Sequence, residues 1–65
     1  MNLVLLNSVG SVVDLEEKIV YPQLESGLPD LDMGVSLVDD EIPGDWFDAL
    51  NEQDLAIVKE LVDYL

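Results

Sequence analysis

Carboxylates are the only abundant chemically active side chains in this chain of 65 residues. Fifteen Asp and Glu residues stand against two lysines, and the sequence contains no histidine, no cysteine and no arginine. Two carboxylates act as acid and base only when a pocket drives their pKa values apart, and the serines have no histidine to activate them. We therefore predict a protein that is not an enzyme and that uses no cofactor.

One spacing of carboxylates matches part of a calcium-binding loop. Asp30, Asp32 and Glu41 fall at positions 1, 3 and 12 of an EF-hand-like pattern. Position 6, where the sharp turn needs glycine, is Val35, and position 5 is Gly34, which has no side-chain oxygen. Partial matches of this kind arise by chance in so acidic a chain, and we predict no specific metal site.

The acids are most concentrated in the second half of the chain. Residues 28–54 hold nine acids and no basic residue, and the formal net charge of the whole chain is −13. This charge opposes direct binding to nucleic acids or anionic membranes and favours rapid encounter with a basic surface. The acids predicted to contact such a partner are Asp30, Asp32, Asp39, Asp40, Glu41, Asp45 and Asp48. A solvated face that only maintains solubility, or adaptation to high salt, remains the alternative explanation.

Aromatic residues near these acids are candidate anchors for a partner. Trp46 and Phe47 are adjacent in the sequence and cannot both point the same way, so we expect one of them to be exposed. Exposed aromatic residues often carry much of the binding energy of an interface. Tyr21 is a third candidate.

These observations favour a small acidic protein-binding module that docks on a basic surface of a larger partner and inhibits or regulates it. Suitable partners are a nucleic-acid-binding enzyme or a toxin with a basic cleft. Mimicry of DNA would need two rows of acids, for example residues 30 and 32 beside residues 45 and 48. Carboxylates two apart on a strand are about 6.8 Å apart, whereas one DNA strand presents a charge every ~3.4 Å.

A different class of function is also consistent with the sequence. The chain would then be a structural or assembly subunit, or a homodimer, whose functional surface is the apolar side of its C-terminal helix. In that case the acids would serve only to keep the protein soluble.

The C-terminal region is predicted to be helical over residues 45–64, with its main helix at residues 52–64. Asn51 is a favourable N-cap, Asp54 follows at the capping-box position, and Leu50 and Leu55 have the spacing of a hydrophobic staple. Asp45 is expected to cap a short turn before this helix. The apolar side of the helix, which we expect to face the core, comprises Leu55, Ile57, Val58, Leu61, Val62, Tyr64 and Leu65.

The N-terminal region has the pattern of strands. Residues 2–6 form a short apolar run, and Gly10 lies in turn-forming sequence where a positive φ is easily adopted. A second strand is expected within residues 11–21, although a helical turn over residues 14–18 is an open alternative. Pro22 should end that strand or confine it to an edge.

We predict a loop over residues 22–32 and a third strand over residues 33–38. The strand is predicted because Met33, Val35 and Leu37 alternate with residues that would face the other side. The expected fold is a single α+β domain over residues 1–65. It comprises a small antiparallel sheet of two to three strands with one C-terminal amphipathic helix packed on it.

Composition also bears on the compartment. The hydrophobic fraction of 49% is too high for a disordered acidic tail. The N-terminal apolar run lacks the basic region of a signal peptide and is too short to span a bilayer. Together with the absence of cysteine, this predicts a cytoplasmic protein.

Overall fold

A four-stranded antiparallel sheet forms the first part of the fold. The computed structural model describes residues 2–65, and the strands pair in the order β1-β2-β3-β4. Their bounds are Leu3–Leu6 for β1, Ser11–Asp14 for β2, Ile19–Pro22 for β3 and Val35–Ser36 for β4. The α+β prediction is confirmed, but the expected two to three strands were too few, because residues 11–22 supply two strands rather than one.

Two tight turns connect the first three strands. Gly10 has a φ of 64°, as its place in the first turn predicted. The segment after Asp14 is neither strand nor helix: the Asp14 side chain accepts the backbone N–H groups of Glu16, at 2.9 Å, and Glu17, at 3.1 Å. Lys18 then adopts a φ of 58°, and the chain reverses into β3. The side chain of Asp14 thereby competes with continued strand pairing.

The predicted strand over residues 33–38 is mostly absent. Met33 is instead the last residue of a 3-10 helix, Leu31–Met33, and β4 covers only Val35–Ser36. The first two residues of this 3-10 helix belong to the segment that was predicted to be a loop. Ser36 donates its backbone N–H to the Asp40 carboxylate at 2.9 Å, and its hydroxyl accepts backbone N–H groups from the next turn. These local hydrogen bonds replace the ladder of a longer strand.

Two helices follow, α1 over Gly44–Asp48 and α2 over Glu52–Lys59. The short α1 begins after Pro43, and Asp45 lies in its first turn rather than capping it, contrary to the prediction. Neither helix, nor any other helix within residues 2–65, has the length and apolar character needed to cross a membrane.

The predicted N-cap of α2 is confirmed, but its predicted end is wrong. The Asn51 side chain accepts the backbone N–H of Asp54 at 2.8 Å. The helix ends at Lys59 instead of Tyr64, and the Leu61 N–H bonds back by only three residues, at 2.9 Å. The Tyr64 hydroxyl donates to the Leu37 carbonyl at 2.6 Å, which ties the last residues to the turn after β4.

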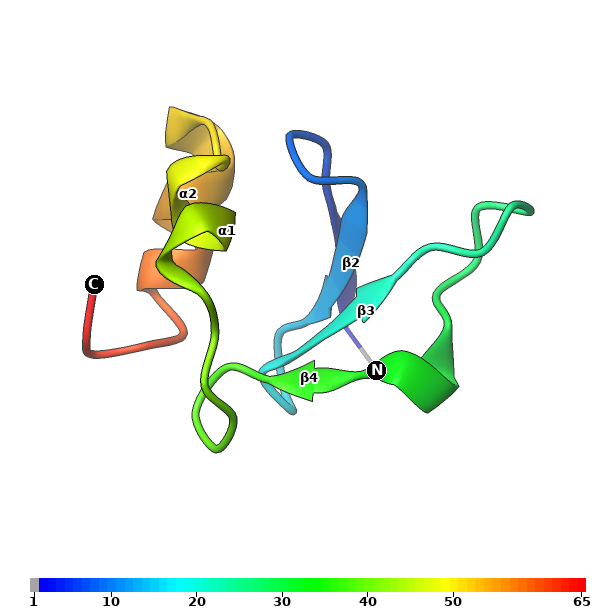
Figure 1. Ribbon diagram of the computed structural model, residues 1–65, viewed down its shortest axis with the longest axis horizontal. Helices are drawn as coiled ribbons and strands as arrows, with labels where there is room; N and C mark the ends of the chain where they lie inside the picture. The colour runs from blue at the N-terminus through cyan, green and yellow to red at the C-terminus, as the bar shows by residue number, and fades with distance from the viewer. Residues whose placement is uncertain (1) are drawn as a thin grey trace.

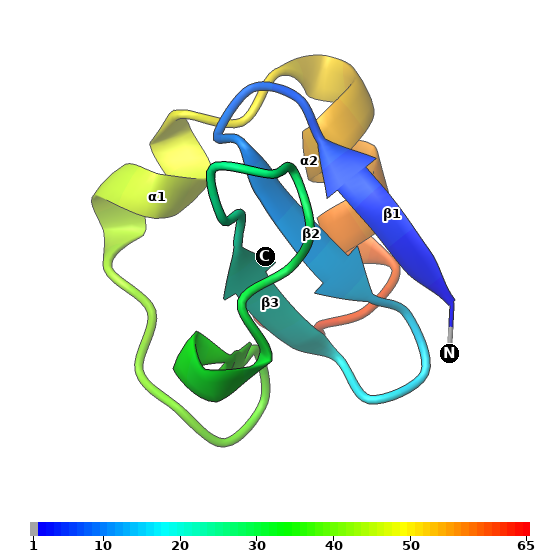
Figure 2. The ribbon, with the colours of Figure 1, turned by 90° about the vertical axis from the view of Figure 1, so that its right-hand side faces the viewer.

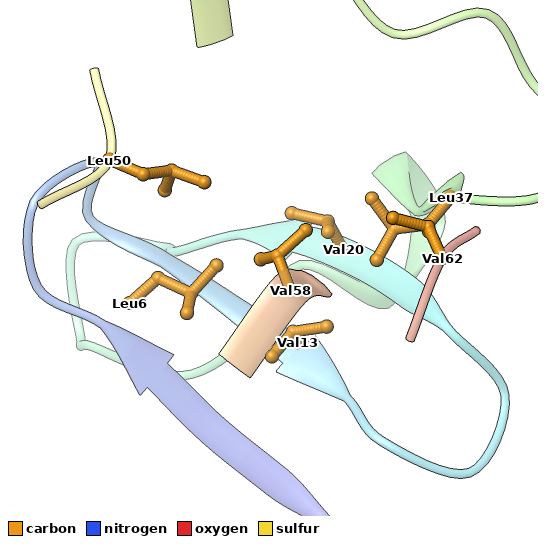
Figure 3. Close-up of a cluster of buried hydrophobic side chains, with 7 residues drawn as sticks. All are labelled: Leu6, Val13, Val20, Leu37, Leu50, Val58 and Val62. Atoms are coloured by element: carbon orange, nitrogen blue, oxygen red, sulfur yellow. The ribbon is translucent and has the colours of Figure 1, made fainter. Parts of the chain in front are cut away.

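The sheet separates two layers. The helices lie on one face, while residues 23–30 cross the opposite face (Figures 1 and 2). Strand pairing places Val13 opposite Val20 and Val20 opposite Val35 on the helical side. Figure 3 shows the buried core between sheet and helices, made of Leu6, Val13, Val20, Leu37, Leu50, Val58 and Val62. The apolar side of α2 therefore faces the core, as predicted.

Candidate functional site

Most of the carboxylates are solvent-exposed. Among the predicted contact residues, six are exposed: Asp32, Asp39, Asp40, Glu41, Asp45 and Asp48. Asp30 is half-buried, and its side chain accepts the Asp32 backbone N–H at 3.3 Å at the start of the 3-10 helix. Asp40 also holds the local turn through Ser36. Asp30 and Asp40 thus have structural roles, and the other five are available to a partner.

Two acids are buried and belong to the fold. Asp14 is 2% exposed and Asp54 is 3% exposed. Asp54 accepts hydrogen bonds from the backbone N–H of Ser8, at 2.9 Å, and from the Ser8 hydroxyl. The acidic sequence at residues 28–54 therefore presents fewer surface charges than its nine acids suggested.

Trp46 and Phe47, the adjacent aromatic residues of α1, contact each other. Both are half-buried against the core, so neither is the fully exposed anchor that we expected. Their rings meet edge-to-face at 5.2 Å, and Phe47 makes a second edge-to-face contact with Tyr64 at 5.9 Å. Phe47 is thus held between two aromatic rings, which leaves Trp46 as the better candidate for contact with a partner.

Tyr21 is buried in the sheet and is not accessible as an anchor. It is 9% exposed and lies on the face opposite the helices. A Cβ atom added to Gly34 would lie 2.6 Å from Cε1 of the tyrosine ring. The ring therefore covers the backbone of Gly34, so Tyr21 serves packing between β3 and the start of β4.

An apolar groove of about 300 Å³ opens on the helical side of the sheet. Ser11 and Pro22 are paired residues of β2 and β3, and Val20 and Val35 are paired residues of β3 and β4. All four line the groove, because residues two apart on one strand share a face. The Ser11 hydroxyl and the Trp46 indole N–H are the only polar side-chain groups in the lining within residues 2–65.

The remaining walls of the groove come from the segments before and after residues 39–41, which are three consecutive acids. Met33 lines it from the 3-10 helix, and Ile42, Pro43 and Trp46 line it from the chain leading into α1. Met33 is 61% exposed, whereas Trp46 is half-buried. The groove is therefore open to solvent at its Met33 side.

Exposed acids adjoin these lining residues in the chain. Asp32 precedes Met33, Glu41 precedes Ile42 and Asp45 precedes Trp46. Consecutive Cα atoms are about 3.8 Å apart, so the backbone of each of these three acids lies next to a residue of the groove wall.

Nothing in residues 2–65 gathers three or more carboxylates into an arrangement that could hold a metal ion. The calcium-like spacing at residues 30–41 is divided between a 3-10 helix, a short strand and a turn. Asp30 already accepts a backbone hydrogen bond there.

Of the residues that line the groove, only Trp46 was a predicted contact residue. Met33 and Val35 were interpreted as one face of a strand, and they are 61% and 38% exposed. Ile42 and Pro43 were treated only as a connection to the helix. The sequence feature that could have indicated the groove residues is that apolar residues directly follow acids within residues 32–46.

In comparisons with known proteins, no family model, no curated protein and no solved structure matches this chain.

Proposed function

We propose that this protein is a small, non-catalytic acidic module that docks on a basic surface of a larger partner and inhibits or regulates it. A net charge of −13 on 65 residues makes encounter with a basic surface fast and encounter with a nucleic acid or an anionic membrane unfavourable. A basic cleft in a nucleic-acid-binding enzyme or in a toxin has the required chemistry. The absence of cysteine supports the cytoplasm as the compartment.

The observation that carries this proposal is the set of exposed acids in the segment that supplies most walls of an apolar groove, three of which directly precede lining residues in the chain. Asp32, Asp39, Glu41 and Asp45 are exposed, and their side chains take part in none of the hydrogen bonds found among residues 2–65. Retaining uncompensated charges on so small a protein costs stability through self-repulsion. A basic partner would relieve that repulsion.

The two rows of acids considered for a nucleic-acid mimic come from different elements. Residues 30 and 32 lie at the 3-10 helix, and residues 45 and 48 lie in α1. Met33 and Trp46, beside these rows, line one apolar groove. Support is therefore stronger for an acidic face with an apolar centre than for a continuous double row of charges.

The experiment compares capture of basic proteins by two variants with equal loss of charge. The acidic-face variant carries Asp32→Asn, Asp39→Asn, Glu41→Gln and Asp45→Asn. The control variant carries Glu16→Gln, Glu17→Gln, Glu60→Gln and Asp63→Asn, all at exposed positions outside the 30–48 segment. Partners are captured from lysate of the source organism at low salt, identified, and then titrated in purified form.

We expect the acidic-face variant to lose at least about tenfold in affinity for a purified partner at low salt, and the control variant to lose much less. Adding DNA or RNA as a competitor tests whether this protein occupies the cleft in which the partner binds nucleic acid. Equal losses of affinity in both variants would mean that the total charge of the protein, and not the position of the acids, determines binding. Unchanged affinity in the acidic-face variant would refute the proposal.

A further inference from the structure

The apolar groove is suited to a side chain rather than to a whole small molecule. Its volume of about 300 Å³ lies at the lower limit of ligand pockets, which span roughly 300–1,000 Å³. The lining gives a ligand few polar contacts, because the Ser11 hydroxyl and the Trp46 indole N–H are its only polar side-chain groups in the described residues. A ligand would gain mainly by burying apolar surface against Val20, Val35 and Trp46.

The charge beside the groove limits what can occupy it. Asp32, Glu41 and Asp45 adjoin lining residues in the chain, and the lysines are at positions 18 and 59, outside the segment from β3 to α1 that builds most of the groove. A second copy of this chain would bring its own net charge of −13 and be repelled. A nucleic acid or an anionic lipid surface is disfavoured for the same reason.

The apolar lining and the exposed acids that precede lining residues are together complementary to one chemistry: an apolar side chain with cationic neighbours. Lys and Arg side chains are long, extend from a peptide on either side of a central residue and can approach the carboxylates of Asp32, Glu41 and Asp45. The central side chain would meanwhile displace water from the groove. Specificity in this arrangement comes from the groove, and the acids accelerate association.

We propose that the groove receives an apolar side chain from a partner segment in which Lys or Arg flanks that residue on both sides. The inference rests on the proposed function and deepens it, because it names the part of the basic partner that is recognised. Trp46 forms one wall and reports on occupancy, since it is the single tryptophan of the chain.

Synthetic peptides test this inference without altering the protein. The apolar probe carries a central Leu-Phe pair flanked by three lysines on each side. The matched probe replaces that pair by Ser-Ser and keeps the charge, and a third probe keeps Leu-Phe and replaces the lysines by glutamine. Trp46 fluorescence gives the affinity of each, because none of the probes contains tryptophan.

We expect the apolar basic probe to bind at least about tenfold more tightly than the serine probe, since burying one large apolar side chain is worth that much or more. It should also shift Trp46 emission, whereas the glutamine probe should bind weakly. The double variant Met33→Ser/Val35→Ser should abolish the advantage of the apolar probe. Val38→Ser/Leu28→Ser is its control, because both residues are exposed and lie outside the groove.

The outcomes separate this inference from the function on which it rests. Equal affinity for the two lysine probes, with no change in Trp46 emission, would overturn the groove as a recognition site and leave the acidic docking surface standing. Equal affinity of the wild type and the acidic-face variant for the lysine probes would instead count against the proposed function. The inference also fails if no lysine probe binds at low salt.

Discussion

The buried carboxylate of Asp54 is hydrogen-bonded to Ser8, which lies 46 residues earlier in the chain. The Ser8 hydroxyl donates to that carboxylate and also accepts the backbone N–H of Asn51, at 3.1 Å. In a capping box the residue at this position would reach the N-cap N–H itself. Here a serine from the β1–β2 turn takes that N–H, so the start of α2 is fixed to the sheet.

Removal of the Asp54 side chain should therefore destabilise the protein. We expect Asp54→Ala to lower the free energy of unfolding by about 1.5–3 kcal/mol, because a hydrogen-bonded buried charge is lost and the Ser8 N–H is left without its partner. Ser8→Ala should cost about 1 kcal/mol. Urea denaturation followed by Trp46 fluorescence measures both.

The control is Glu52→Ala, which removes an exposed acid from the same turn of α2 and should change stability by less than about 0.5 kcal/mol. In the Asp54→Ala background, Ser8→Ala should have a smaller effect than in the wild type, since the two residues interact directly. Equal effects of Asp54→Ala and Glu52→Ala would show that the long-range cap contributes nothing.

Gly34 should not tolerate a larger residue. An added Cβ would lie 2.6 Å from Tyr21 and 2.9 Å from Cγ2 of Ile19, so Gly34→Ala should cost about 1–3 kcal/mol in thermal or urea denaturation. At Gly44 an added Cβ meets nothing within 4 Å, so Gly44→Ala should stabilise α1 by about 0.4–1 kcal/mol. A loss at position 34 no larger than the change at position 44 would contradict the close packing of Tyr21.

Two adjacent apolar residues after β4 should differ sharply in importance. Leu37 is fully buried, whereas Val38 is 54% exposed. We expect Leu37→Ala to cost about 2–5 kcal/mol because it leaves a cavity in the core, and Val38→Ala to stay within about 0.5 kcal/mol. Comparable losses at the two positions, measured by urea denaturation, would mean that Leu37 is not part of the core.

Salt should stabilise this protein. At about 0.01 M ionic strength charges interact over roughly 30 Å, which exceeds the 22 Å second dimension of the molecule, whereas at about 0.15 M the range is roughly 8 Å. The melting temperature should rise as NaCl is increased, and it should rise less in the acidic-face and control variants, which carry fewer charges. Identical salt dependence in the wild type and both variants would exclude charge repulsion as the cause.

Local sequence was most informative where neighbouring residues define the structure. Asn51 caps α2 and Gly10 forms a turn because the required contacts lie within a few residues. The strand prediction at residues 33–38 failed for a related reason. Alternating apolar residues favour a strand, but the hydrogen bonds of Ser36 and Asp40 favour a turn. The alternation alone does not show which of these two structures is more stable.

The sequence by itself determined the α+β class, the dense negative charge, the helix start at residue 52 and the core-facing side of that helix, because composition and short-range spacing specify these features. Only the tertiary structure decided which acids are buried and which are exposed to a partner. Asp54 is buried and hydrogen-bonded to a serine distant in the chain, while Asp32, Glu41 and Asp45 directly precede residues that line one groove. Burial and grooves depend on contacts between segments far apart in the sequence, and no local pattern encodes those contacts.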